Sequence, residues 1–302
     1  MEGRGKKILP EDGSELECNW TDGKPHGTGI RTYTDGGVFT CSYRDGAAHG
    51  PGLRKYANGD TFECTWRAGE THGHGVMRYA SGGVLSCQFK NGKANGKGFA
   101  ARADGTKFEG AWKDGVACGK GTRLYANLDV LVCKWKGDHA SGKGTKRFKS
   151  GDILECTWRN NVAEGPGKMT YANGDILECR FTNDVATGKG KKTYATGDVY
   201  KGTFLAGLEH GRGNKKLPDG RVMVAIWAAG KLDGVGTEYH EGGTHFYKCT
   251  WKDGALLRRS ERMTSTRAAL MCHESGGAHS AWLAHKNLPE PPSSPSGHKR
   301  QR

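Results

Sequence analysis

The chain has 302 residues, of which 49 are glycine and only 35% are apolar, and its formal net charge is +14 at pH 7. This composition excludes a thick hydrophobic core of the kind that a large globular enzyme needs, because too few side chains are available to fill it. The positive charge favours anionic partners, such as acidic lipid or nucleic acid.

A period of 23 residues governs the chain from residue 10 onward. Residues 1–9 form a short basic lead-in that has no apolar stretch of the kind found in export signals. Ten regular units follow, over residues 10–236, and an imperfect unit extends to residue 254. A fixed period of this length is typical of a repeat array. The sequence also contains no apolar run long enough for a membrane span.

Each unit has the pattern of a β-hairpin. In the unit that begins at Tyr56, Asn58-Gly59 favours a two-residue turn, because both residue types tolerate positive φ. The run after this turn alternates, so that Phe62 and Trp66 share one face of a predicted strand. The sequence therefore predicts an all-β fold, an elongated single array of antiparallel β-hairpins.

One aromatic column and one pair of glycines recur in every regular unit. Glycine inside a strand indicates close approach of another group, so we expect the ring of Trp66 to pack against Gly73 and Gly75. The column is expected to be structural. Its tryptophans are Trp20, Trp66, Trp112, Trp135, Trp158 and Trp227.

Seven of the ten cysteines occupy a second column: Cys18, Cys41, Cys64, Cys87, Cys133, Cys156 and Cys179. Neighbours in this column would lie two strands apart, about 10 Å, which is too far for a disulfide. We therefore interpret them as small buried apolar groups. No CxxC motif is present, so no metal site is expected, and the sequence indicates no cofactor. Reduced cysteines predict an intracellular, cytoplasmic protein, with peripheral membrane attachment as a further option.

Two motifs that suggest chemistry have simpler explanations. Residues 137–144 match a phosphate-binding loop except that Gly144 replaces the Ser or Thr that binds Mg²⁺. The same Gly-Lys-Gly recurs in three other units, so the repeat accounts for it. Histidines that precede the first glycine of the pair occupy a column where other units have Asn, Ser, Thr, Glu or Asp. A polar turn position is therefore a better reading than a row of metal ligands.

Basic residues form two rows near the paired glycines. The first row lies between the glycines: Lys97, Lys120, Lys143, Lys189 and Arg212. The second lies slightly beyond them: Arg31, Arg54, Arg123, Lys146, Arg147, Lys192 and Lys215. Such stripes can bind phosphoinositide head groups, anionic lipid or nucleic acid. The alternative is that they keep exposed strands soluble and protect sheet edges from aggregation. Nucleic acid is disfavoured, because the aromatics belong to the packing column and are not available to stack bases.

The regular pattern ends near residue 254. Trp251 arrives one residue late, which predicts a bulge or a terminal capping hairpin. Residues 255–302 form a basic tail containing Pro and Ser, which we expect to be largely disordered, with a short helix around residues 266–273 and a disordered composition from Leu288 onward. No catalytic domain is expected in this tail.

The recurring motif resembles the MORN (membrane occupation and recognition nexus) family. The best copy is residues 194–204, YATGDVYKGTF, followed by HGRG at residues 210–213, and the resemblance covers about residues 10–254. It implies a hairpin array used as a scaffold, with roles in protein anchoring, acidic-phospholipid binding and self-association. Cysteine where the family usually has glycine is the main departure.

We therefore expect a non-enzymatic scaffold or adaptor that binds a protein partner and can attach to anionic membrane surfaces. Two alternatives remain open: a phosphoinositide- or acidic-phospholipid-binding module, and a regulatory partner of an enzyme supplied in trans. A homodimer is also compatible with the resemblance.

Overall fold

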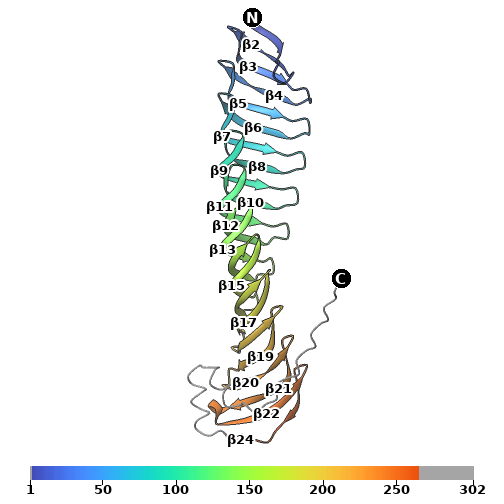
Figure 1. Cartoon of the computed structure of the whole chain (residues 1–302), viewed down its shortest axis with the longest axis vertical. Helices are drawn as coiled ribbons and strands as arrows, with labels where there is room; N and C mark the ends of the chain where they lie inside the picture. The colour runs from blue at the N-terminus through green and yellow to red at the C-terminus, as the bar shows by residue number, and fades with distance from the viewer. Residues whose placement is uncertain (1, 265–302) are drawn as a thin grey trace, which may run out of the picture. The chain divides into compact units, whose positions relative to one another are not determined.

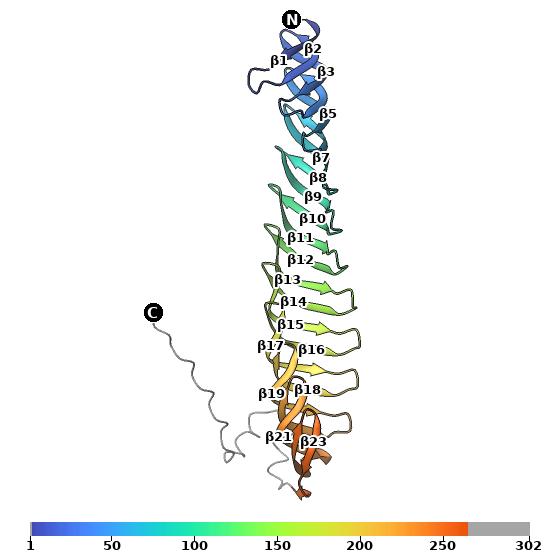
Figure 2. The same cartoon turned by 90° about the vertical axis from the view of Figure 1, so that its right-hand side faces the viewer.

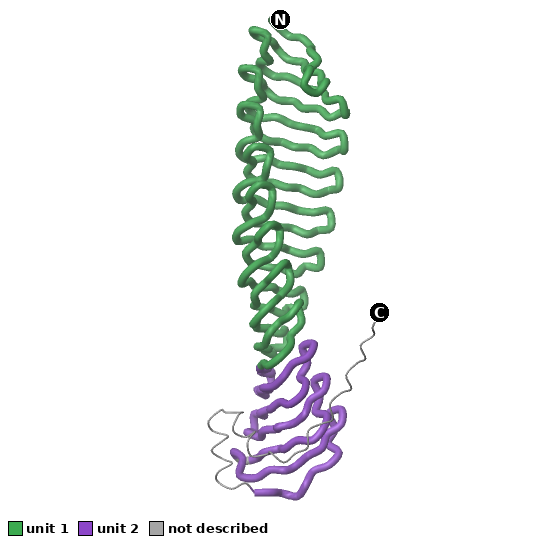
Figure 3. The backbone as a smooth tube through the Cα atoms, viewed as in Figure 1, with its two compact units in different colours: residues 1–190 green, residues 191–302 purple. Residues whose placement is uncertain are grey.

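The computed structural model describes residues 2–264 (Figure 1). The chain divides into two compact units, residues 1–190 and 191–302, and each is described by itself (Figure 3). Within the described residues every regular element is a β-strand, apart from one short 3₁₀ turn, η1 (Glu241–Gly243). The predicted helix around residues 266–273 lies outside the described residues.

Unit 1 is built from β-strands of six to nine residues. They are β1 (Gly3–Ile8), β2 (Glu15–Thr21), β3 (Lys24–Thr32), β4 (Val38–Arg44), β5 (Ala47–Lys55), β6 (Thr61–Arg67), β7 (Glu70–Arg78), β8 (Val84–Lys90), β9 (Lys93–Ala101), β10 (Lys107–Lys113), β11 (Val116–Leu124), β12 (Val130–Lys136), β13 (His139–Arg147), β14 (Ile153–Arg159), β15 (Val162–Thr170), β16 (Ile176–Thr182) and the first part of β17 (Val185–Thr193).

From β1 to β16, each strand pairs antiparallel with the next strand along the chain. The two views of unit 1 show these strands following one another in chain order (Figures 1 and 2). The predicted all-β array of antiparallel hairpins is confirmed. One detail differs, because the basic lead-in is itself a strand: β1 pairs with β2, and Lys6 forms an ion pair of 2.8 Å with Glu15.

Unit 2 contains β18 (Val199–Leu205), β19 (Leu208–Lys216), β20 (Val222–Ala228), β21 (Lys231–His240), β22 (His245–Lys252), β23 (Ala255–Arg259) and β24 (Met263–Thr264). The extra residue that places Trp251 one position late in its repeat lies in the turn between β21 and β22, which contains η1. Strands β23 and β24 both pair with β22. The start of the predicted disordered tail is therefore ordered, because its backbone pairs with the last long strand.

Two kinds of turn join the strands. Around Asn58, the Tyr56 N–H donates to the Asp60 carbonyl over 2.9 Å, and Gly59 has a φ of 87°. This closes a three-residue loop, so the predicted two-residue turn is wrong at this position. The two-residue turn lies ten residues later, where Ala68 and Gly69 have φ values of 52° and 82° and link β6 to β7.

Every strand of the array has an inner face and an outer face. We call inner the face that carries Phe62, Cys64, Trp66 and their equivalents, and outer the face that carries the alternate residues, such as Glu63 and Thr65. The inner-face aromatics are buried and pack within the array. The six tryptophans are between 3% and 7% exposed: Trp20, Trp66, Trp112, Trp135, Trp158 and Trp227.

The paired glycines have two separate roles, and the ring over each pair comes from a different repeat than we expected. A Cβ on Gly52 would lie 3.1 Å from the Trp66 ring, and a Cβ on Gly75 would lie 2.9 Å from the ring of Phe89. Each ring therefore covers the second glycine of the preceding repeat, whose missing side chain makes the space. Gly73, with φ of 77° and open space around it, lies at a β-bulge.

Candidate interaction surfaces

The first basic row lies on the outer face. Lys120 lies opposite Lys134, and Lys143 lies opposite Thr157, an outer-face position equivalent to Thr65. The side chains of this row in unit 1 are exposed: Lys97, Lys120, Lys143 and Lys189. Within the described residues, none of these four ammonium groups has a carboxylate within ion-pair distance. Arg212, in unit 2, is also exposed and lies opposite Ile226.

Three further cations of unit 1 extend this outer row, and we had not included them: Lys134, Lys168 and Arg180. They were missed because Lys134 and Arg180 lie on the first strand of their hairpins and outside the glycine-flanked column. The cross-strand register reveals Lys134, which lies opposite Lys120, and it places Lys168 between Glu155 and Glu178. Like charges directly opposite each other in a sheet destabilise it. An anion at this place would remove that repulsion.

The second basic row lies on the inner face, where it takes part in the packing, except for Arg147, which follows Lys146 directly and is exposed on the outer face. The Lys146 ammonium lies 3.0 Å from the Asp129 carboxylate and 4.6 Å from the centre of the Phe148 ring. In unit 2, Lys215 lies 2.9 Å from Asp198. These cations thus have both carboxylates and aromatic faces as partners. Since their charge is already compensated, the structure supports a structural role for them more than the anion-binding role that we had considered.

Lys192 and Arg123 belong to the same inner row but differ in their surroundings. The Lys192 ammonium lies 3.7 Å from the Glu209 carboxylate and 4.5 Å from the centre of the Tyr194 ring. The Arg123 guanidinium lies 4.1 Å from the centre of the Trp135 ring, and its Nε atom is buried without a hydrogen-bond partner. Charge compensation along this row is therefore incomplete.

The cysteine column does not form a reactive centre. All nine cysteines in the described part of the chain are free thiols, and all seven members of the column are buried, as is Cys249 on β22. Burial raises the pKa of four thiols to about 11: Cys41, Cys87, Cys133 and Cys179. At neutral pH they are protonated and therefore poor nucleophiles. This agrees with their interpretation as small packing groups.

Neither of the other two motifs becomes a site. Gly142, Lys143 and Gly144 lie in the middle of β13, so they do not form the loop before a helix that phosphate binding requires. Among residues 2–264, no group of three or more His, Cys, Asp or Glu side chains is placed to hold a metal ion. No helix in the same range is long and apolar enough to cross a bilayer.

Together these features define a repeat protein that consists of stacked antiparallel β-hairpins, with one face filled by its own rings and the other exposed. The chain belongs to the MORN repeat family, whose pattern matches more than half of it. The nine matched stretches are residues 19–38, 42–61, 65–84, 88–107, 108–130, 134–153, 157–176, 180–199 and 200–220. MORN repeats are non-enzymatic modules that interact with proteins or membranes, which gives this chain its general class.

Other comparisons add little. Curated proteins give no significant match. Among solved structures, the TCP10 domain of Danio rerio CPAP in complex with a STIL peptide has 14% identity and a TM-score of 0.41, covering 74% of this chain and 93% of that one. The TCP domain of Drosophila melanogaster SAS-4, in complex with a proline-rich motif, has 16% identity and a TM-score of 0.32, covering 57% and 86%. Both similarities are too low to carry an argument.

Proposed function

We propose that this protein is a non-enzymatic scaffold whose outer face binds an acidic surface of a protein partner. The observation that carries the proposal is the exposed outer row, in which Lys120 and Lys134 lie directly opposite each other. Two like charges at this spacing disfavour the sheet unless a third group compensates them. An acidic partner surface supplies that group and gains affinity from it.

The inner face supports the same assignment by exclusion. Its aromatic rings are buried against glycines of neighbouring repeats, and several of its cations are paired within the array. The outer face is therefore where a large area of side chains is left for a partner. Its exposed residues include apolar ones, such as Phe99 and Val132 at 39% and 49%, which can add contact area to the charge attraction.

An anionic membrane surface is the second candidate. The same outer lysines carry it, because phosphoinositide head groups attract clustered Lys and Arg. The third candidate, regulation of an enzyme in trans, predicts that proximity labelling in the source cell returns an enzyme. The return of non-enzymatic proteins alone would contradict that third candidate.

The test uses a variant in which four outer lysines are changed to glutamate: Lys97, Lys120, Lys143 and Lys189. We expect capture of the native partner from source-cell extract to fall about tenfold or more, since exposed charges at an interface control how fast the partners associate. The control changes four other exposed lysines to glutamate: Lys55, Lys90, Lys113 and Lys136. These lie at strand ends, so the net charge changes equally while the outer row is kept.

Equal loss with both variants would show that only net charge matters, and unchanged capture with the outer-row variant would contradict the proposal. Sedimentation with vesicles that contain phosphatidylinositol phosphates separates the two partner classes. If the outer-row variant loses vesicle binding but keeps its protein partners, the membrane candidate replaces the protein one.

A further inference from the structure

Inner-face cations are matched to acids 17 residues earlier in the chain. Asp129 pairs with Lys146, and Asp198 pairs with Lys215. In the next repeat the order of the two charges is reversed, with Arg221 in the position of the acid and Glu238 in the position of the cation. The contact is kept, at 3.2 Å. Lys146 and Lys215 thus have a carboxylate at a defined place in the turn one strand earlier, whereas Arg31 has Ser14 at that position and pairs with Asp12 instead.

Arg54 has neither arrangement. The residue 17 positions earlier is Gly37, which has no side chain to offer. The Arg54 guanidinium lies between two rings, 4.5 Å from the centre of Tyr33 and 4.7 Å from the centre of Tyr56. No carboxylate of the described residues lies within ion-pair distance of it. Arg54 is therefore held in the geometry of its paired equivalents but lacks the acid.

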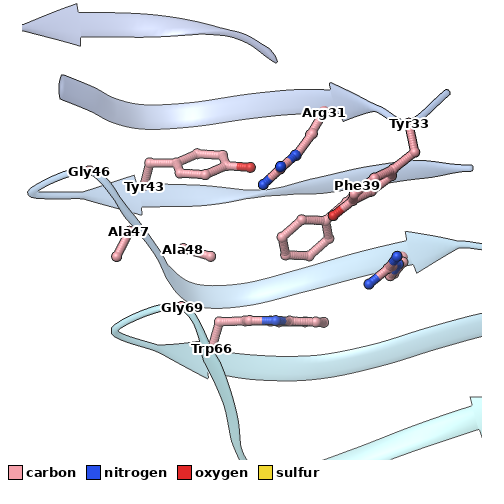
Figure 4. Close-up of a pocket in the computed structure, with 10 residues that line it drawn as sticks. Arg31, Tyr33, Phe39, Tyr43, Gly46, Ala47, Ala48, Trp66 and Gly69 are labelled. Atoms are coloured by element: carbon pink, nitrogen blue, oxygen red, sulfur yellow. The ribbon is translucent and has the colours of Figure 1, made fainter. Parts of the chain in front are cut away.

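A cavity of about 340 Å³ lies beside Arg54. Its lining includes Arg54, Arg31, Tyr33, Tyr43 and Trp66 (Figure 4). Arg31 does not need a ligand, because Asp12 lies 2.9 Å from it and Ser14 accepts a 2.7 Å hydrogen bond from its Nε atom. The cavity therefore offers one uncompensated positive charge and aromatic walls, and its volume is within the usual range of ligand sites.

Tyr43 supplies a second polar group to the same cavity. Its side chain is 6% exposed, and its hydroxyl is buried without a hydrogen-bond partner. Figure 4 shows this hydroxyl directed toward the side of the cavity where Arg31 lies. Burial raises the pKa of the hydroxyl, so the group remains a neutral donor. A buried donor without an acceptor is destabilising, and an oxygen of a bound anion would satisfy it.

The same deviation occurs once more in unit 1. Arg123 is preceded by Thr106 at the 17-residue spacing, so it also lacks a carboxylate. Its Nε atom is buried without a partner, and a smaller cavity of about 80 Å³ lies beside it. The two cavities are thus both found in repeats that keep the cation and lose the acid.

We infer that the Arg54 cavity is a binding site for the side-chain carboxylate of an acidic segment of a partner protein. A carboxylate is favoured over other anions because it is the partner of the equivalent cation in the paired repeats. Arg54 binds it as an ion pair. The site is on the inner face and does not depend on the outer-face function proposed above.

The test measures binding of a fluorescent peptide of alternating Glu and Gly to the full chain, by anisotropy, beside the same peptide with Gln. The Glu peptide is expected to bind, and Arg54→Met is expected to weaken it about tenfold or more, because a partly buried ion pair is lost. Methionine suits the position, since Met77 and Met169 occupy the same column. Lys55→Met, which removes one charge on the opposite face of β5, is expected to change binding less than about twofold.

Gly37→Asp provides an independent arm. It supplies the missing acid at the 17-residue spacing, so it is expected to compensate Arg54 and weaken Glu-peptide binding while the arginine is retained. A Cβ at Gly37 would lie 3.0 Å from an Asp35 side-chain oxygen, which can move. Equal binding of Glu and Gln peptides, or equal losses in R54M and K55M, would overturn the inference.

Discussion

Replacement of Trp135 by alanine is expected to lower the free energy of unfolding by about 3 to 5 kcal/mol. The ring is 3% exposed, it lies 5.1 Å from the centre of the Phe108 ring, and its Nε1–H donates to the Gly121 carbonyl over 3.1 Å. The Arg123 guanidinium also lies over it. Alanine removes the apolar contacts and leaves both a cavity and an unpaired carbonyl.

The measurement is urea unfolding followed by circular dichroism, on the variant and on Trp135→Phe. Phenylalanine already fills this column at Phe89, Phe181 and Phe204, so this control is expected to lose less than half as much stability. Because repeat arrays can unfold in parts, the comparison uses the shape of the whole unfolding curve as well as its midpoint. If alanine and phenylalanine cost the same small amount, the ring is not part of the core.

A valine at Gly144 is expected to be the second large loss, about 1 to 3 kcal/mol or more, because the added atoms overpack the strand. A Cβ at this position would lie 2.5 Å from the Cys133 Cβ, 2.8 Å from the Val132 carbonyl oxygen and 3.0 Å from the Trp158 ring. The Val132 oxygen is a backbone atom, and the Cys133 Cβ is bonded directly to the backbone, so neither can move by itself. The strands and the ring therefore have to move apart.

Lys143→Val is the matched control for Gly144→Val, since it places the same side chain one residue earlier on the exposed outer face. It is expected to change the free energy of unfolding by no more than about 0.5 kcal/mol. Thermal unfolding of both variants decides between them. A stable G144V protein whose melting temperature is unchanged would show that the rings do not need the space above this glycine.

Strand positions and core residues followed from the sequence because the repeat shows each column ten times. The turns were less predictable. Asn58-Gly59 has the residues of a two-residue turn, but the Tyr56 N–H bonds to the Asp60 carbonyl and lengthens the loop. At Ala68, by contrast, an alanine adopts positive φ, and nothing in the chemistry of alanine predicts this. Local propensity cannot decide between two registers that a backbone hydrogen bond fixes.

The sequence alone was enough to assign the two basic rows to opposite faces. Lys143 and Lys146 are three positions apart, an odd number, so on a strand they point to opposite faces. The 17-residue match between acids and inner cations was also present in the sequence. It became interpretable only when the pairing of Asp129 with Lys146 showed which columns meet in space.

The central claim is that the array presents one basic row to solvent and keeps the other inside its packing. Lysine acetylation of the native chain, followed over time by mass spectrometry, tests this most directly. We expect Lys97, Lys120 and Lys143 to react quickly, and the paired inner lysines Lys146 and Lys215, whose side chains are 23% and 19% exposed, to react several times more slowly. Equal rates for the two rows, or faster labelling of the inner one, would contradict the account.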